Sequence, residues 1–373
     1  MYIYNMSNRP IILSLLCVVL FFSGKVIHAQ NTVLQKHENT LIQPPYLKAG
    51  DTVAIVAPSG ILQNRTQEIQ KAKDLLNSWG LAVIVGENVF KQNNHFAGTD
   101  DERCADFQKA LDNKAVKAIW CARGGYGTVR ILDKLDFTQF KKSPKWIIGY
   151  SDITALHSQI HIEGVESLHA MMCTSLQDDT KEIEETIQTF KSALFGDSLK
   201  YVLKGSEYNK TGSVTAPLVG GNLTVLHTLL GSKTSVDTSG KILFIEDIGE
   251  YKYHIDRMLQ SLKRAGYFDN CKGLVVGDMT KLRKNTTLWG SSVEQLILDA
   301  LSDYHFPIAF NMPAGHEKDN RAMILGRTIN LNVSKDIKVS YVDEENPEGI
   351  LADIVNTRSY TNLYSYASSI WAL

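Results

Sequence analysis

The sequence predicts an α/β protein of two domains. The N-terminal domain is expected to be a doubly wound, mainly parallel sheet with a nucleophile elbow, and the smaller C-terminal α/β domain to have a mixed sheet. Two observations support this prediction. Short apolar strands alternate with amphipathic helices from residue 51 to about residue 160, and again after residue 216. The length of 373 residues also favours two domains.

In the N-terminal half, apolar strands end at turn-forming segments, and helical stripes follow. Such strands are expected at 51–57, 81–85, 116–121 and 146–148. Three of them run into the turns Pro58–Gly60, Arg123–Gly127 and Gly149–Ser151. Because parallel sheets place their ligand sites beyond the carboxyl ends of the strands, we expect these three turns to converge.

The stretch 145–160, KWIIGYSDITALHSQI, is the most informative segment of the chain. An apolar run typical of a buried strand turns at Gly149, and apolar residues then recur at helical spacing. Ser151 would therefore project its hydroxyl from a strand–turn–helix elbow, beside a helix N-terminus. The sequence lacks the second glycine of the G-x-S-x-G pattern, and Ser151 or Asp152 as a simple helix cap is an equal alternative.

A polar, turn-rich segment divides the chain. We predict an N-terminal domain over residues 47–177, an interdomain linker over 178–215 and a C-terminal domain over 216–343. In the last of these, a leucine-rich helix follows Gly220-Gly221-Asn222. Further strands are expected at 241–245, 273–277, 307–310, 322–325, 329–333 and 337–342.

The N-terminal residues predict export to the periplasm. Arg9 precedes the apolar run 11–22, and Ala29 stands before a suitable cleavage point, so residues 1–29 have the layout of a signal peptide. The run is short for a bilayer span, so we expect no stable membrane insertion after cleavage, with an uncleaved N-terminal anchor as the alternative. Residues 30–46 are expected to be a polar leader, and residues 344–373 a C-terminal extension without an assigned role.

Composition excludes several classes of protein. A net charge of −1 gives no electrostatic reason to expect nucleic acid as a partner. After removal of the signal, the cysteines form no C-x-x-C motif or Cys/His cluster, so we predict free thiols, no metal and no cofactor. These cysteines are Cys104, Cys121, Cys173 and Cys271.

A serine nucleophile needs a base, and the base works best when a carboxylate orients it. His316 stands in a Pro-x-Gly-His turn after an apolar strand, where the backbone aims the side chain; a surface loop histidine is the alternative. Glu246 closes an apolar strand at the expected ligand edge. It would equally serve the following helix as a cap, a role open also to Asp247 or Glu250.

The loop RGGYG supplies two adjacent glycines. Gly124 and Gly125 would let backbone N–H groups approach an oxyanion closely. A plain strand-to-helix turn explains the pair as well.

Taken together, six segments resemble the serine LD-carboxypeptidase family, which includes the microcin C self-immunity peptidases. They occur in the order found in the family and cover most of residues 49–330. The segments are GDTVAIVAPSG, ARGGYGTVRILDKLDF, KWIIGYSDITALH, GGNLTVLHTLLGS, ILFIEDIGEYKYHIDRML and MPAGHEKDNRAMILG.

The resemblance implies a Ser–Glu–His triad divided between the two domains. Ser151 would be the nucleophile, Glu246 the orienting acid and His316 the base. The backbone N–H groups of Gly125 and Asp152 would form the oxyanion hole. The family also implies a homodimer.

The resemblance further implies hydrolysis of an L,D amide bond, with release of the terminal D-alanine from a murein tetrapeptide. Arg123, beside Gly124, is the candidate for binding the free carboxylate of the substrate, with a structural ion pair as its alternative. Two other functions stay open: hydrolysis of peptidyl or acyl-sulfamoyl nucleotide amides, as in the immunity branch, and periplasmic binding of murein peptides without catalysis. Relatives that recycle cell wall are generally cytoplasmic, so the expected export leaves the physiological substrate open.

Overall fold

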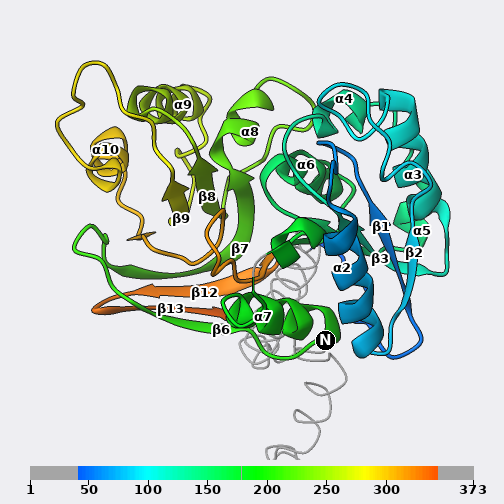
Figure 1. Cartoon of the computed structure of the whole chain (residues 1–373). Coiled ribbons are helices and arrows are strands. Elements are labelled where there is room, and N and C mark those ends of the chain that lie inside the picture. The colour runs from blue at the N-terminus through cyan, green and yellow to red at the C-terminus, as the bar shows by residue number, and fades with distance from the viewer. Residues whose placement is uncertain (1–40, 178, 343–373) are drawn as a thin grey trace, which may run out of the picture.

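The computed structural model describes residues 41–177 and 179–342, which form two lobes side by side, each built on one sheet (Figure 1). The expected signal peptide, most of the leader and the C-terminal extension lie outside the described residues. Within the described ranges, no helix combines the length and the apolarity that crossing a bilayer requires.

The first lobe has a six-stranded sheet in the order β11-β5-β4-β3-β1-β2. Neighbouring strands from β1 to β5 are parallel, and β11 is antiparallel to β5. The mainly parallel sheet that the sequence predicts is confirmed. The strands are β1 (Thr52–Val56), β2 (Ala82–Val85), β3 (Val116–Cys121), β4 (Trp146–Gly149), β5 (Ser167–His169) and β11 (Met323–Leu325).

Helices cover both faces of this sheet, which explains why its strands are apolar without interruption. On β3, Trp120 belongs to the core on one face, and its neighbour Ile119 belongs to the core on the other. The first face packs against α2 (Thr66–Ser78) and α7 (Glu184–Phe195). The second packs against α3 (Asp100–Asp112), α4 (Thr128–Leu132), α5 (Thr138–Lys142) and α6 (Thr154–Ile162).

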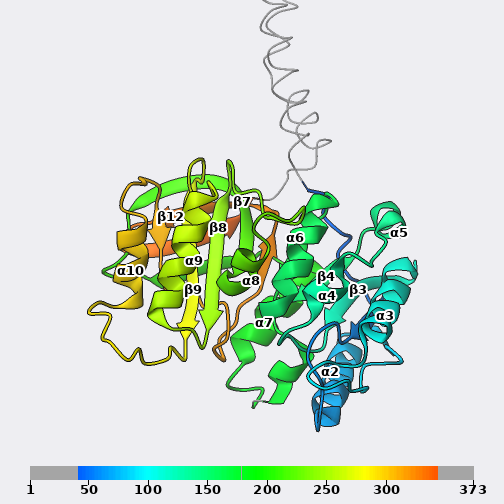
Figure 2. The ribbon, with the colours of Figure 1, turned by 90° about the horizontal axis from the view of Figure 1, so that it is seen from above.

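The second lobe has a seven-stranded mixed sheet in the order β10-β9-β8-β7-β12-β13-β6. β7 to β10 are parallel, whereas β12, β13 and β6 add antiparallel pairs, so the mixed sheet is confirmed. The helices α8, α9 and α10 lie over the parallel half (Figure 2). The bounds are β6 (Lys200–Lys204), β7 (Gly212–Asn222), α8 (Leu223–Thr228), β8 (Ile242–Ile248), α9 (Lys252–Arg264), β9 (Gly273–Thr280), α10 (Val293–Ala300), β10 (Ile308–Ala309), β12 (Thr328–Val333) and β13 (Asp336–Tyr341).

Two segments differ from the simple domain order. The stretch 178–215, expected to be a linker, contains α7 and β6, and β6 pairs with β13 in the second sheet. The charged residues at the start of this stretch led to the linker prediction, although α7 has a buried face that includes Phe190 and Leu194. The strand expected near 322–325 is β11, which extends the first sheet at the edge of β5 rather than joining the second. The domain boundaries themselves stay a proposal.

The lobes share a continuous core and a buried ion pair. One cluster joins residues of the first sheet and α7 to residues of β12 and β13. Arg327, between β11 and β12, donates to the Glu166 carboxylate at 2.5 Å, and both side chains are largely buried. The position of one lobe relative to the other is therefore set by packing as well as by chain connections.

Candidate active site

The three turns that follow β1, β3 and β4 meet at the carboxyl edge of the first sheet. The Gly60 N–H donates to the Gly124 carbonyl at 3.0 Å. The buried Asp152 carboxylate accepts from the Ser59 hydroxyl at 2.6 Å and from the Thr128 N–H at 2.8 Å. The carboxylate next to Ser151 therefore ties both other turns to the β4 turn, and the expected convergence is confirmed.

Ser151 occupies a strained strand-to-helix turn. β4 ends at Gly149, and Ser151 has φ of 63° at the start of a 3₁₀ turn that leads into α6. Left-handed φ is uncommon for residues other than glycine, and such strain clusters at functional sites. A Cβ at Gly149 would lie 2.8 Å from Cγ1 of Ile153, so the turn requires glycine there.

The alternative of a simple helix cap is not what the structure has. Neither the 3₁₀ turn nor α6 has a side-chain hydrogen bond at its N-cap, and Asp152 is committed to Ser59 and Thr128. The Ser151 hydroxyl makes no hydrogen bond within the described residues. Ser151 is partly exposed at the turn, which leaves its hydroxyl free to react.

The glycine loop after β3 rests directly on Ser151. A Cβ at Gly124 would lie 3.1 Å from the Ser151 Cβ and 3.4 Å from its Oγ. Gly125 is exposed and has φ of 104°, a conformation that favours glycine. Gly124 and Gly125 are therefore glycines for different reasons, close approach and backbone conformation. The oxyanion role of the Gly125 and Asp152 N–H groups stays a prediction.

Glu246 and His316 form a buried acid–imidazole pair in the second lobe. Glu246 lies near the end of β8 with no exposed surface, and its Oε2 lies 2.7 Å from Nδ1 of His316. Gly315 allows this approach, because a Cβ there would lie 3.1 Å from the same Oε2. The Nδ1 contact leaves Nε2 of the imidazole for a proton donor such as a serine hydroxyl.

The charges around His316 favour its cationic form. Burial lowers the pKa of His316, but the Glu246 carboxylate, followed by those of Asp247 and Asp278, more than offsets this. The net effect is a pKa above the ordinary histidine value. Such an environment stabilises the imidazolium that forms when a base accepts a proton.

The other acids near Glu246 have different partners. Asp247 accepts from the N–H and hydroxyl of Thr224, at 3.0 and 2.8 Å, and from the Asn222 side-chain amide. Burial raises the pKa of Asp247 to about 6. Glu250 lies 2.8 Å from Nδ1 of His254. The sequence allowed Glu246, Asp247 or Glu250 to cap the following helix; in the structure, Glu246 is the one of the three that contacts His316.

The serine turn and the histidine loop meet through their neighbours. The ring of Tyr150, immediately before Ser151, lies edge-on to the imidazole of His316 with centroids 5.0 Å apart. At the start of α6, the Thr154 hydroxyl oxygen accepts from the Asn222 N–H of β7 at 2.9 Å. Within the described residues the Ser151 hydroxyl makes no hydrogen bond to His316. Catalytic hydrogen bonds of this kind are often incomplete without substrate and tighten when it binds.

Arg123 lies half-buried beside the glycine loop. Its guanidinium donates to the Ile61 carbonyl, and its pKa is lowered by burial and by the nearby Arg65. Among the ion pairs of the described ranges, none joins Arg123 to a carboxylate, so the expected alternative of a structural ion pair is not found there. Its role in substrate binding stays a prediction.

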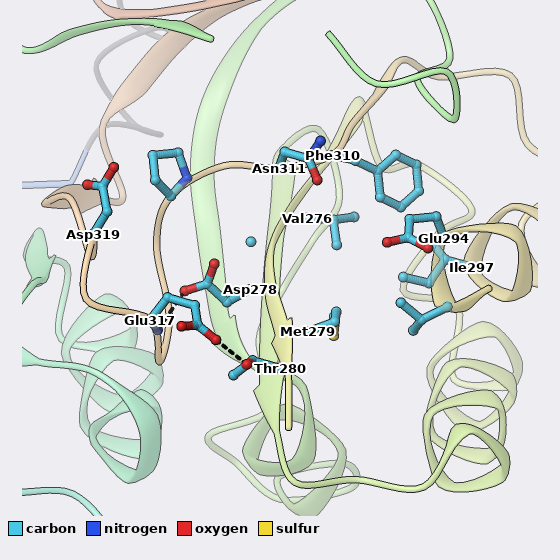
Figure 3. Close-up of a pocket in the computed structure, with 13 residues that line it drawn as sticks. Val276, Asp278, Met279, Thr280, Glu294, Ile297, Phe310, Asn311, Glu317 and Asp319 are labelled. Atoms are coloured by element: carbon cyan, nitrogen blue, oxygen red, sulfur yellow. Dashed lines mark hydrogen bonds between the residues drawn. The ribbon is translucent and has the colours of Figure 1, made fainter. Parts of the chain in front are cut away.

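A cavity of about 360 Å³ lies beside the histidine loop, between β9 and α10 (Figure 3). Asp278 lines it and accepts from the Glu317 N–H at 3.0 Å, and the Thr280 hydroxyl donates to the Glu317 carboxylate. Burial raises the pKa of Asp278 to about 6. Sequence reasoning missed Asp278, although it comes directly after the strand expected at 273–277, just as Glu246 comes after the one expected at 241–245.

The described residues offer nothing that resembles a metal centre. Across 41–177 and 179–342, His, Cys, Asp and Glu side chains form no group of three that could hold a metal ion. The four cysteines that the structure describes are free thiols.

An elbow serine and a buried acid–imidazole pair, on two packed α/β lobes, are an arrangement typical of serine hydrolases. The chain belongs to the LD-carboxypeptidase family: residues 53–170 match the model of its N-terminal domain, and residues 215–331 match that of its C-terminal domain. It is 34% identical to the probable murein peptide carboxypeptidase of Bacillus subtilis, over 83% of this chain and 97% of that protein.

Solved structures agree with this assignment. The muramoyltetrapeptide carboxypeptidase from Oxalobacter formigenes is 29% identical, with a TM-score of 0.71 over 79% of this chain and all of that one. The microcin C7 self immunity protein MccF shares the fold, with a TM-score of 0.74 over 81% of this chain and 99% of that one, at 20% identity.

Proposed function

We propose that the chain is a serine-type LD-carboxypeptidase that releases the terminal D-alanine from murein tetrapeptides by hydrolysing an L,D amide bond. The observation that carries the catalytic part is the 2.7 Å contact between Glu246 and His316, on the lobe facing the strained Ser151 turn. The substrate class is supported by the curated relatives, whose names include a murein tetrapeptide carboxypeptidase.

The proposed reaction begins with proton transfer. His316 Nε2 takes the Ser151 proton as Oγ attacks the amide carbonyl carbon, and Glu246 stabilises the imidazolium. The N–H groups of Gly125 and Asp152 donate to the oxyanion, a contribution of about 3 kcal/mol for one donor in comparable enzymes. The imidazolium then protonates the leaving amine of D-alanine as the C–N bond breaks. Water repeats the sequence on the acyl-enzyme, with His316 again as the base.

A carboxypeptidase must also recognise a free carboxylate. We propose that Arg123 supplies the positive charge, since it lies beside the glycine loop and donates only to a backbone carbonyl in the described structure. Its half-buried position strengthens a charge-assisted hydrogen bond relative to one in open water. Gly124 would line the same part of the site, where its lack of a side chain leaves room for the substrate.

We also propose export and dimerisation. The apolar run 11–22 after Arg9 supports a signal peptide over residues 1–29 and a periplasmic location for the mature protein. A homodimer is inferred from the family resemblance. N-terminal sequencing of protein from the periplasmic fraction tests the cleavage site, and light scattering of the purified protein tests the dimer. An intact N-terminus or a monomeric mass would contradict the respective proposal.

Mass spectrometry of muropeptides tests the proposed activity. Purified protein is incubated separately with a murein tetrapeptide and with an acyl-sulfamoyl adenosine. We expect the tetrapeptide to lose one alanine, with no loss for Ser151→Ala. Cleavage of the sulfamoyl compound alone would show that the chain has the activity of the immunity peptidases instead. Tight binding of the tetrapeptide without cleavage would indicate a murein-binding protein.

A further inference from the structure

The loop that carries His316, residues 313–322, is anchored on two sides. On one side lies β9, where the Asp278 N–H donates to the Ala314 carbonyl at 3.0 Å. The Asp278 carboxylate accepts from the Glu317 N–H, immediately after His316 (Figure 3). This anchor belongs to the lobe that also supplies Glu246.

The second anchor comes from α7, in the segment expected to be a linker. The Thr186 hydroxyl donates to the Lys318 carbonyl at 2.9 Å and accepts from the Asn320 N–H at 2.8 Å. Thr186 is 1% exposed; its hydrogen bond with Asn320 is buried, and the one with Lys318 is partly buried. Asn320 continues the connection, because its Oδ1 accepts from the Gly315 N–H at 3.0 Å, directly before His316.

The same helix is packed on the first lobe. The Phe190 ring, one turn after Thr186, contacts Trp120 of β3 with centroids 5.1 Å apart, and Trp79 at 5.8 Å. β3 leads into the glycine loop that rests on Ser151. Both ribbon views place α7 between the lobes (Figures 1 and 2). α7 therefore packs on the sheet that carries Ser151 and is hydrogen-bonded to the loop that carries His316.

We propose that Thr186 is a positioning residue that holds the His316 loop in register with the Ser151 turn. The inference rests on the proposed function, in which His316 is the base. Removing the hydroxyl would break both hydrogen bonds between α7 and the loop and set an apolar methyl group against the Lys318 carbonyl and the Asn320 N–H, which would keep their 3.1 Å contact with each other but lose this anchor to α7. Displacement of a base by even 1 Å lowers turnover strongly, because proton transfer depends on alignment. The nearby pair between Arg321 and Glu185, at 3.8 Å, is partly exposed and contributes less.

The test compares Thr186→Val, which keeps the side-chain shape, with Thr186→Ser, which restores the hydroxyl. For Thr186→Val we expect kcat to fall about ten- to a hundredfold with KM changed less than twofold, and Thr186→Ser to recover most of the loss. Thr238→Val is the matched control. It also loses a buried threonine hydrogen bond, 2.6 Å to the Tyr267 carbonyl, but Thr238 precedes the start of β8, whereas Glu246, the partner of His316, lies near the end of that strand.

An NMR titration of His316 separates this inference from the proposed function. If Thr186 positions the loop, Thr186→Val lowers the pKa of His316, because the imidazole loses its alignment with Glu246. Unchanged kcat and His316 pKa in that variant, or an equal kcat loss in Thr238→Val, would overturn the positioning role while leaving the hydrolase intact. If the wild-type protein cleaves no tetrapeptide, the proposed function fails, and the His316 titration alone still decides the role of Thr186.

Discussion

The Ser151 turn and the His316 loop are built in different ways. The turn owes its backbone conformation to neighbours in the sequence, since Gly149 leaves room for Ile153 and Ser151 follows at φ of 63°. The hydrogen bonds that Asp152 accepts from Ser59 and Thr128 then hold the turn at the sheet edge. The loop is fixed by partners far away in the sequence: Glu246 is 70 residues distant and Thr186 is 134 residues from Asn320. The backbone of the nucleophile turn is thus set locally, whereas the conformation of the loop that carries the base depends on distant partners, so the base should be the more sensitive of the two to distant substitutions.

The largest loss of activity should come from removing the nucleophile. Ser151→Ala should lower kcat by about four orders of magnitude or more, as loss of a catalytic serine does in comparable hydrolases. Release of D-alanine followed by mass spectrometry measures it. The unfolding midpoint should not fall, because alanine removes only a hydroxyl that has no hydrogen bond within the described residues. Near-normal turnover would refute the nucleophile.

The second largest loss of activity should come from changing Glu246, the acid that contacts His316. Glu246→Gln should lower kcat on the order of 10³-fold or more, because the amide no longer stabilises the imidazolium. The pH profile gives a second signature. The base must be neutral, so kcat/KM should rise with pH through the His316 pKa, which the neighbouring carboxylates raise above the ordinary histidine value. Loss of the Glu246 charge lowers that pKa, so the acid limb should move to lower pH.

Asp247→Asn is the matched control for Glu246→Gln. Asp247 accepts its hydrogen bonds from Thr224 and Asn222 rather than from His316, so activity should change less than tenfold. Loss of these buried contacts should destabilise the fold by about 1–2 kcal/mol in denaturant unfolding. If the two variants exchanged their effects, Asp247 would be the orienting acid.

A smaller effect is expected from crowding the serine. In Gly124→Ala the new Cβ would lie 3.1 Å from Cβ of Ser151 and 3.3 Å from Cε of Met172. The side chains must shift by a few tenths of an ångström, so we expect about a tenfold fall in kcat. Steady-state kinetics with the tetrapeptide measures this effect. Wild-type kcat would show that the loop tolerates a side chain there.

The smallest expected effect is on substrate binding. Arg123→Gln should raise KM about tenfold and leave kcat within twofold, because the guanidinium would contact the substrate carboxylate in the ground state and the transition state alike. The same assay with a substrate amidated at its C-terminus is the control. If the variant and the wild-type protein prefer the free carboxylate equally, another residue recognises it.

The contrast between the two halves also explains what the sequence could predict. The elbow was predictable because the hydrophobic period changes from strand to helix at Gly149, a signal contained in sixteen residues. The choice of Glu246 over Asp247 and Glu250 needed the direction of each side chain, which adjacent positions in a sequence do not reveal. The family resemblance selected it; in the structure Glu246 is the acid that contacts His316, and its role as the orienting acid stays a prediction.

Other parts could not be predicted because their partners lie far along the chain. β11 pairs with β5, more than 150 residues earlier, so local patterning gave no reason to place it in the first sheet. α7 begins in a charged run that resembles a solvated linker, and its buried residues belong to the core cluster that also contains strand residues of both lobes. Tertiary context determines both segments.

Covalent trapping shows whether Ser151 is a nucleophile that His316 activates. The purified full-length protein is treated with a fluorophosphonate, and the modified peptide is identified by mass spectrometry. We predict one adduct, on Ser151, that forms far more slowly in His316→Ala because no base then activates the hydroxyl. Absence of an adduct on Ser151, or equal labelling of the His316→Ala variant, would contradict a serine nucleophile activated by the histidine of the other lobe.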